Sequence, residues 1–324
     1  MKLADGAKQK PMSPVDGAPA VLVLLGAGRG GTTLLYKLLA LHRDVGYLSN
    51  YQQRFPRVPA TAVMHRLVRD RHAVKLEAWF QADGGAYFQG RRQRLQAMVP
   101  TPFEGEGVYA ACGIPRWPAR GVRPDSDACR RLRETLRRIQ RWAGAQVVVT
   151  KRTANNRRVA WLETAFPQAR YVHLIRDGRA VARSLLVVHW WSDHTLFWAG
   201  QTPARLVEEG HDELELAARN WVEELAEIRV GLSAVPSERI LTVRYERLLE
   251  SPHSVLADVL DFVGIPAGTD AGFDAAIDRV GLRPRTTDWA RGLSDAARAR
   301  LEALQSEELA RWGYLEPRTA GRPT

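Results

Sequence analysis

Short apolar runs alternate with longer amphipathic stretches along most of this chain. The run Val21–Leu25 is apolar throughout and leads, through the glycine-rich residues 26–31, into a stretch over 32–41 with leucines on one face. A continuous apolar run of this length is typical of a strand buried on both faces, and leucines spaced by three and four residues are typical of a helix. The pattern predicts a strand, a glycine loop and a helix, in that order.

The same alternation returns after residue 145. It predicts strands over 146–150, 170–175 and 239–243, and helices over 127–142, 156–166, 178–188, 212–232 and 254–263. Strands that alternate with helices favour a parallel sheet with helices on both faces. We therefore expect an α/β, three-layer fold in a single domain over residues 21–316, with a mobile N-terminal tail at 1–20 and a C-terminal tail at 317–324.

Residues 44–125 interrupt this pattern. Prolines break the segment repeatedly, and only residues 60–80 have a spacing that predicts a helix. Irregular insertions of this kind often carry the loops that determine specificity. We interpret the segment as an insertion that shapes a substrate site.

Composition and charge narrow the class of protein. The 324 residues include 47 Lys and Arg against 36 Asp and Glu, a formal net charge of +11, which indicates anionic partners such as nucleic acid, an acidic membrane surface or a phosphorylated small molecule. Cys112 and Cys129 are too few for a disulfide framework, which favours a reducing compartment. Residues 1–20 lack the apolar core of a signal peptide, and the apolar runs are too short to cross a bilayer. We expect a cytoplasmic protein.

Residues 26–33 have the features of a phosphate-binding loop. Glycines let the backbone close around an anion, and the amides and dipole at the start of the following helix favour negative charge. Arg29 adds a full charge, and Thr32 and Thr33 add hydroxyl donors. The glycine spacing agrees with the loop of nucleotide triphosphatases, but Thr32 occupies the position of the lysine. The dinucleotide-binding pattern is also met, but no acidic residue follows at the distance that would hold a ribose.

Gly28–Leu35 resembles the 5′-phosphosulfate loop of sulfotransferases that use 3′-phosphoadenosine-5′-phosphosulfate (PAPS). That loop commonly has a Lys or Arg, then a Ser or Thr, then Gly-Thr-Thr. Arg29 falls on the basic position, whereas Gly30 replaces the hydroxyl residue. The resemblance implies that one end of the donor is held by Arg29, Gly30, Gly31, Thr32 and Thr33.

A second string, Leu174–Ser184, resembles the 3′-phosphate motif of the same family. Arg176 and Ser184 fall on the two positions that hold the 3′-phosphate. The chemistry is consistent, because a guanidinium at a strand end can form charge-assisted hydrogen bonds to a phosphate, and the hydroxyl of a serine two helical turns later can donate a further one. Asp177 is expected to cap the helix that begins there.

The resemblance extends over most of the chain outside 44–125. Lys151–Pro167 is similar to the segment that leads into the 3′-phosphate motif, with Asn155 on a recurring asparagine that can equally cap the next helix. Val243–Pro266 is similar to a stretch in which a tyrosine contacts adenine, here Tyr245. The resemblance implies a P-loop NTPase-like sulfotransferase fold of the bacterial type, with 44–125 on the acceptor side and no metal.

The family resemblance also implies a reaction: transfer of a sulfuryl group from PAPS to a hydroxyl of a small molecule, sugar or lipid. Arg29 would stabilise the charge on the moving group. Glu104, in a Pro-x-Glu segment similar to that of some bacterial-type members, would take the acceptor proton. Four other residues stay open for the role of the base: Glu106, His72, His189 and His194.

Other interpretations also stay open at this point. The aromatic segment 189–198 either lines an acceptor pocket or packs in the core. A P-loop kinase or nucleotidase is the alternative activity, opposed by Thr32 at the lysine position and by the lack of an evident magnesium-binding aspartate after a later strand. A nucleic-acid partner is not expected, since only the net charge supports it. The acceptor and the oligomeric state are not specified by the sequence.

Overall fold

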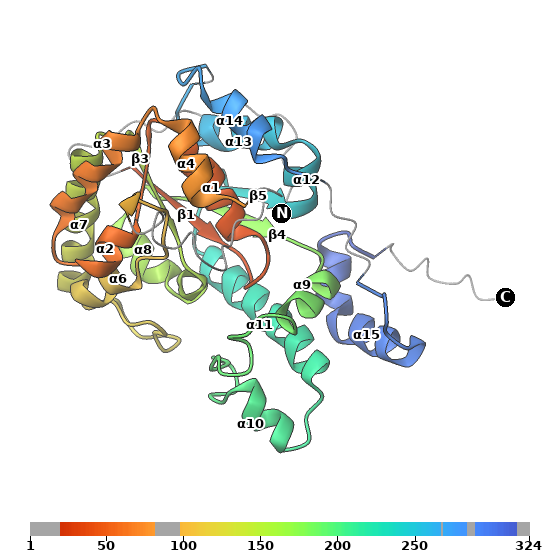
Figure 1. The fold of residues 1–324 in the computed structure, drawn as a ribbon. Coiled ribbons are helices and arrows are strands. Elements are labelled where there is room, and N and C mark those ends of the chain that lie inside the picture. Colours follow the sequence, from red (N-terminus) through yellow and green to blue (C-terminus); the bar gives the residue numbers. More distant parts are fainter. Residues whose placement is uncertain (1–19, 82–97, 267, 284–288, 316–324) are drawn as a thin grey trace.

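The computed structural model describes residues 20–81, 98–266, 268–283 and 289–315; the predicted tails lie almost wholly outside these ranges. At its centre is a sheet of five parallel strands in the order β2-β3-β1-β4-β5 (Figure 1). The strands are β1 (Val21–Leu25), β2 (Val45–Tyr47), β3 (Val147–Lys151), β4 (Arg170–Ile175) and β5 (Ile240–Arg244). The predicted parallel sheet is confirmed.

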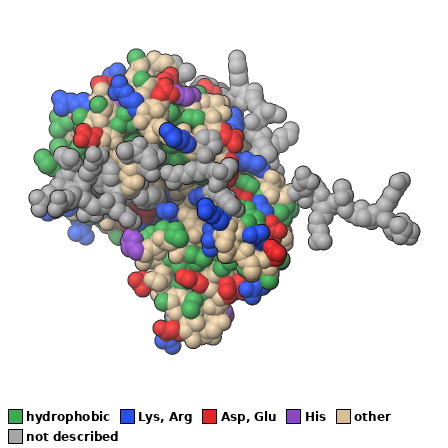
Figure 2. All heavy atoms as spheres, turned by 45° about the vertical axis from the view of Figure 1, so that its right-hand side comes forward, with side chains coloured by type: hydrophobic (Ala, Val, Ile, Leu, Met, Phe, Trp, Pro, Cys, Tyr) green, Lys and Arg blue, Asp and Glu red, His purple; other side chains and the backbone are tan. Residues whose placement is uncertain are grey.

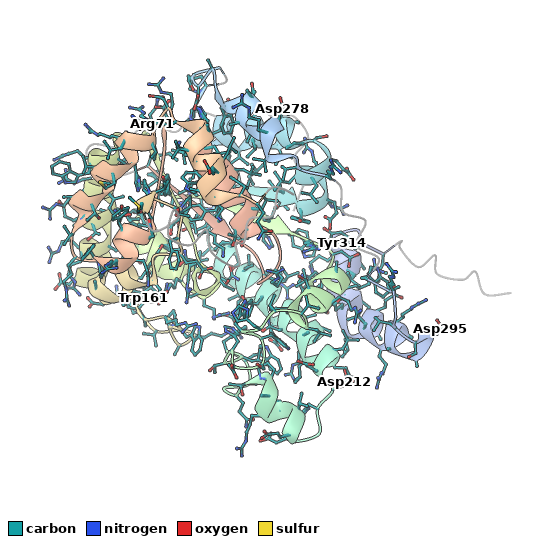
Figure 3. All side chains as sticks on the ribbon, in the orientation of Figure 1. Arg71, Trp161, Asp212, Asp278, Asp295 and Tyr314 are labelled. Atoms are coloured by element: carbon teal, nitrogen blue, oxygen red, sulfur yellow. The ribbon has the colours of Figure 1, made fainter. Side chains whose placement is uncertain are left out.

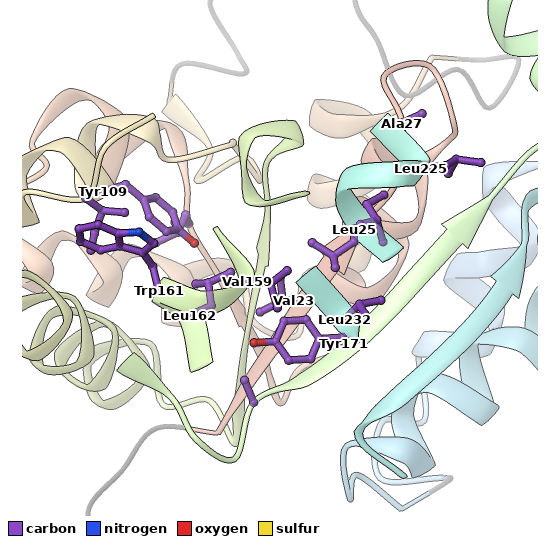
Figure 4. Packing of buried hydrophobic residues seen from close by; sticks show 14 of the residues in the cluster. Val23, Leu25, Ala27, Tyr109, Val159, Trp161, Leu162, Tyr171, Leu225 and Leu232 are labelled. Atoms are coloured by element: carbon purple, nitrogen blue, oxygen red, sulfur yellow. The ribbon is translucent and has the colours of Figure 1, made fainter. Parts of the chain in front are cut away.

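The central strands are apolar throughout because both faces of the sheet are covered. All five residues of β1 are buried, with Val21, Val23 and Leu25 in one hydrophobic cluster and Leu22 and Leu24 in the other. Figure 4 shows Val23 and Leu25 packed among side chains of the first cluster. This two-sided burial explains the unbroken apolar runs in the sequence.

Helices form a layer on each face of the sheet (Figure 1). One layer consists of α1 (Thr32–Leu41), α4 (His72–Trp79), α12 (Tyr245–Glu250), α13 (Pro252–Phe262) and α14 (Phe273–Val280). The other consists of α7 (Ser126–Ala143), α8 (Val159–Ala165), α9 (Gly178–Leu185), α11 (Glu213–Leu232) and α15 (Asp295–Arg311). The expected three-layer α/β fold is confirmed.

Shorter elements connect these layers. They are α2 (Asn50–Arg54), α3 (Met64–Val68), α6 (Glu106–Cys112), α10 (Pro203–Glu208) and the 3₁₀ turns η1 (Pro59–Val63), η2 (Thr153–Arg157) and η3 (Ser237–Arg239). Among the described helices, none is both long and apolar enough to cross a membrane.

The prediction of one helix over 60–80 is wrong. The chain forms η1, α3 and α4 instead, with a break at Arg71, whose backbone is not helical (φ −96°, ψ 62°). The amine of Lys75 donates to the carbonyl oxygens of Arg69 and Leu41, at 3.0 and 2.9 Å. The Lys75 side chain thus satisfies the Arg69 carbonyl oxygen at the break, and also the carbonyl oxygen of Leu41 at the end of α1.

Two further boundaries also differ from the predictions. The helix expected over 156–166 is divided into η2 and α8, and the one expected over 178–188 ends at Leu185. The strand β2 was not predicted, because three residues that include Gly46 are too short to show a period.

Candidate active site

The glycine loop after β1 folds as an open helix N-terminus. Gly31 adopts a left-handed conformation (φ 94°) directly before α1, and no side chain of the described residues caps the helix. A Cβ at Gly31 would overlap the ring of Tyr245, so only glycine lets the loop and this ring lie so close. The first-turn amides of α1 therefore point towards the loop and favour an anion there.

Arg29 connects the two sequence motifs. Its backbone is left-handed (φ 65°), the only such non-glycine residue among those described. Its Nε donates to Ser184 Oγ at 3.0 Å, and its carbonyl oxygen accepts from Arg176 Nη1 at 2.9 Å. The residues expected at opposite ends of one donor thus lie in direct contact, closer together than the sequence suggested.

The second motif lies at the start of α9, beside α11. Asp177 caps α9 through the backbone amide of Arg179 at 2.9 Å, as predicted. Gly178 packs against the ring of Trp221 on α11, where a Cβ would overlap the indole. Arg176 lies over the Tyr245 ring, with 4.6 Å from guanidinium carbon to ring centroid, and its burial lowers its pKa. Arg29, Arg176, Ser184 and Tyr245 therefore form one cluster.

A cavity of about 490 Å³ opens beside this cluster, at the carboxyl ends of β1 and β3. The carboxyl ends of parallel strands are where ligands bind in open α/β sheets. Residues that line it include Arg29, Gly31, Thr32, Thr33, Glu104, Lys151, Arg152 and His194.

Glu104 faces two cations in this cavity. Lys151 Nζ lies 2.5 Å from its Oε1, and the Arg152 guanidinium pairs with its Oε2. Burial alone would raise the pKa of Glu104, but Lys151 and Arg152 together hold it at about 2. The carboxylate is thus ionised at neutral pH and able to accept a proton, although its two ion pairs keep it weakly basic.

The other candidates for the base are distributed differently. His194 lines the cavity; burial lowers its pKa, and Arg116, Arg157 and Arg152 lower it further, so the imidazole is neutral at pH 7. Glu106 instead pairs with Arg158 at 2.6 Å and Arg152 at 3.1 Å and does not line the cavity.

The remaining two histidines lie outside the cavity lining. His72 pairs with Asp270 at 3.2 Å, and His189 is exposed. The aromatic segment 189–198 is divided between the cavity and the core: Trp190 and His194 line the cavity, whereas Trp191 and Leu196 are buried in the core. Glu104 and His194 are therefore the candidate bases within reach of the loop.

The sequence analysis missed the cavity's basic residues other than Arg29. Lys151 is the last residue of β3 and Arg152 follows it, as Arg176 follows β4, so the rule that carboxyl ends of parallel strands meet was a usable signal for both. Arg116 comes from an irregular loop and carried no comparable signal.

Asn156 holds the first residue of the glycine loop. Its Oδ1 accepts from the Gly26 amide at 3.2 Å, and its Nδ2 donates to the Gly26 carbonyl oxygen at 3.1 Å and to Glu224 at 2.6 Å. Asn155, singled out from the sequence, lies inside η2, and its amide contacts Tyr109 Oη at 3.4 Å rather than capping α8. The asparagine next to the expected one therefore positions the loop.

Comparisons with known proteins agree with the sequence resemblance. A family model described as the sulfotransferase family matches residues 19–270. A search of curated proteins finds no significant match.

Solved structures give the same picture of the fold. A sulfotransferase of Mycobacterium avium, STF9, is similar with a TM-score of 0.57 at 17% identity, covering 96% of this chain and 79% of that one. STF1 of Mycobacterium tuberculosis H37Rv follows with a TM-score of 0.48 at 15% identity over 88% of this chain and 77% of that one. At this level of identity only the fold is shown, and only the first of these scores is high enough to support it.

Proposed function

Because the chain belongs to the sulfotransferase family, we propose that it transfers a sulfuryl group from PAPS to a hydroxyl group of a small molecule, sugar or lipid. The observation that carries the choice of donor is the contact between Arg29 and Ser184, which joins two motifs 155 residues apart. PAPS has anionic groups on both sides of its ribose. Arg29 and Arg176 supply cations from two separate motifs at one site, which supports a donor of this kind.

The residues around the loop fit the phosphosulfate end of such a donor. The Arg29 guanidinium, the first amides of α1 and the hydroxyls of Thr32 and Thr33 would bind it, and these groups are also suited to stabilise charge that develops on the leaving oxygen. Arg176 and Ser184 would hold the 3′-phosphate, and Tyr245 would pack against the adenosine. Holding both ends fixes the sulfur atom relative to the acceptor.

The reaction moves one group. The acceptor oxygen forms a bond to sulfur while the bond from sulfur to the bridging 5′-phosphate oxygen breaks, and the electron pair leaves with that oxygen. By analogy with phosphoryl transfer, the transition state is in-line and loose. The products are a sulfate ester and 3′-phosphoadenosine 5′-phosphate (PAP).

The acceptor proton passes to Glu104 in this proposal. Its carboxylate lies in the same cavity as the loop and is ionised above its pKa of about 2. An anionic sulfuryl donor would attract Lys151 and Arg152 away from Glu104, which would raise the basicity of the carboxylate when the donor is bound. His194 is the second candidate, because it is neutral and lines the same cavity.

Nucleotide binding tests the donor directly. We expect PAP to stabilise the protein against thermal unfolding, by about 2.7 kcal/mol at 100 times its dissociation constant. Sulfate transfer from PAPS to an acceptor panel, followed by mass spectrometry, tests the reaction. Stabilisation by ATP with magnesium but not by PAP would overturn the proposal in favour of a kinase or nucleotidase.

Replacement of the base tests the mechanism. Glu104→Gln is expected to lower kcat by about a hundredfold or more while PAP still binds. In the wild type, kcat/KM for PAPS, which reports the pKa of groups in the free enzyme, should show no acid limb from Glu104 down to about pH 5, because the carboxylate there stays ionised until the pH approaches 2. His194→Asn is the matched variant: if it loses activity while Glu104→Gln keeps it, the histidine is the base.

A further inference from the structure

Three aromatic side chains line the cavity next to Glu104. Phe103, Trp117 and Trp190 come from three different segments, yet each is more than a third exposed and each faces this cavity. Large aromatic groups left exposed together in a concave site are typical of a surface that binds an apolar ligand. Because tryptophan presents a flat face, this wall fits a planar body better than a flexible chain.

Arg116 lines the same cavity as these rings. The Arg116 guanidinium lies over the Trp117 ring, with 4.8 Å from its carbon atom to the ring centroid. Among the described residues, no carboxylate forms an ion pair with Arg116, and burial and the neighbouring Arg152 lower its pKa. Within the described part of the chain, Arg116 differs from the other arginines of the cavity lining in that it contacts an aromatic face and no carboxylate or hydroxyl group.

The other cavity cations contact groups of the protein. Arg152 pairs with Glu104 and Glu106, Arg157 pairs with Glu224 at 3.2 Å, and Lys37 donates to the Trp79 carbonyl oxygen at 2.7 Å. Arg29 contacts Ser184 and belongs to the proposed donor site. Arg116 lies instead on the aromatic side of the cavity, where a donor held by the glycine loop does not need it.

The charge of the cavity also points to an anion beyond the donor. Six Lys and Arg residues line it, against the single carboxylate of Glu104 among the described lining residues. The phosphosulfate end of a donor would neutralise part of this excess near Arg29. Burial is the largest cause of the lowered pKa of His194, and the charges of Arg116, Arg157 and Arg152 lower it further. These three arginines therefore keep the part of the cavity around His194 positively charged.

Resting on the sulfotransferase function above, we propose that the acceptor is a phenolic carboxylate: a planar ring held by Trp117 and Trp190, an anionic group bound by Arg116, and a hydroxyl directed at Glu104. Arginine suits this role because its planar guanidinium can bind a carboxylate through two parallel hydrogen bonds while stacked on an aromatic ring. The cavity volume of about 490 Å³ is in the range of small-molecule sites.

Three matched phenols test the proposal. Para-hydroxyphenylpropanoate, para-ethylphenol and tyramine have the same ring and hydroxyl but carry a negative, a neutral and a positive side chain. For the wild type, kcat/KM for sulfate transfer should fall in that order, by roughly tenfold or more from the carboxylate to the neutral phenol, as one hydrogen bond between charged groups gives. Calorimetric binding to the PAP complex should follow the same order.

Variants of the loop that carries Arg116 supply the controls. Arg116→Ala should abolish the preference for the carboxylate, and Arg116→Glu should make tyramine the better acceptor. Arg123→Ala removes an exposed arginine from the same loop that does not line the cavity, and should keep the wild-type order.

The outcomes separate the two proposals. If PAP does not stabilise the protein, the donor assignment fails. If PAP binds but the three phenols are used equally, or not at all, or if Arg116→Ala keeps the wild-type order, the acceptor proposal is overturned while sulfotransfer stands.

Discussion

Arg29 combines a strained backbone with a central position in the site. Its φ of 65° is unfavourable for a residue with a Cβ, by roughly 1–2 kcal/mol. In this conformation the side chain donates to Ser184 and the carbonyl oxygen accepts from Arg176. Strained residues that persist in this way are often found at functional sites.

Two substitutions at Arg29 distinguish the effect of its side chain on catalysis from the effect of its backbone conformation on stability. Arg29→Ala and Arg29→Gly both remove the guanidinium, so each should lose at least about a hundredfold in kcat for sulfate transfer. Glycine adopts a positive φ without penalty, so Arg29→Gly should be more stable than Arg29→Ala by about 1 kcal/mol. Urea unfolding of the two variants measures this difference, and equal stability would show that the left-handed backbone is not strained.

At the scale of elements, the fit between the glycine loop and α12 fixes the shape of the site. Gly31, the residue before α1, lies against the Tyr245 ring, which begins α12 and in turn lies under Arg176. The loop, the end of β4 and the start of α12 thus meet through one aromatic side chain. A change in the loop at this point should therefore affect the whole proposed donor site.

Two glycines of the same loop provide a matched test. Gly31→Ala forces a Cβ into the Tyr245 ring at a positive φ, and should lower the free energy of unfolding by about 1–3 kcal/mol. At Gly28 a Cβ meets nothing within 4 Å, so Gly28→Ala should leave the free energy of unfolding nearly unchanged. Thermal unfolding without ligand measures both. Equal destabilisation would contradict the close packing of Gly31 on Tyr245.

The elements also show what sequence patterns can reveal. The strands β1 and β4 and the helix α1 have the predicted bounds. A strand buried on both faces is a continuous apolar run, and a helix buried on one face repeats its apolar residues every three or four positions, so both are visible in the sequence. The residues proposed to bind the donor could be singled out from the sequence because they lie in short continuous strings. Asn156 was missed because its partners, Gly26 and Glu224, come from distant parts of the chain and are brought to it by packing rather than by sequence spacing. Arg116 was missed because it lies in an irregular loop, where no periodic pattern or motif marks it.

At the scale of the whole molecule, the net charge of +11 is not gathered into one stripe on the face that Figure 2 shows. Lys and Arg side chains alternate there with Asp and Glu. The cavity, in contrast, is mostly positive: six Lys and Arg residues are among its described lining, against one glutamate. The composition alone suggested several anionic partners, whereas this distribution favours small anions in one site.

The C-terminal part of the chain, beyond the residues that the family model matches, contacts the proposed donor site. Tyr314, labelled in Figure 3, donates to Glu246 at 2.7 Å, and Glu246 accepts from the Asp177 amide at 3.2 Å. Arg179 connects the same turn to Glu302 on α15 at 2.7 Å. The turn between β4 and α9, which carries Arg176, is thereby held in place by residues beyond position 270.

Removal of one hydroxyl tests this support. Tyr314→Phe should raise the dissociation constant for PAP about fivefold, or about 1 kcal/mol, because the Glu246 carboxylate loses a hydrogen bond that orients the turn next to Arg176. Tyr51→Phe removes a hydroxyl from an exposed bond to Met98 and should leave PAP affinity unchanged. Calorimetry measures the PAP affinity of both variants. An unchanged affinity for Tyr314→Phe would rule out that the Tyr314 hydroxyl supports PAP binding.

This arrangement has a consequence for synthesis of the protein. A ribosome produces the glycine loop early and Arg176 midway, but Glu302 and Tyr314 emerge only after nearly all other parts of the donor site have been made. A nascent chain, or one shortened by a stop codon ahead of α15, would contain both of the proposed nucleotide-binding motifs but not these contacts, and should bind PAP weakly.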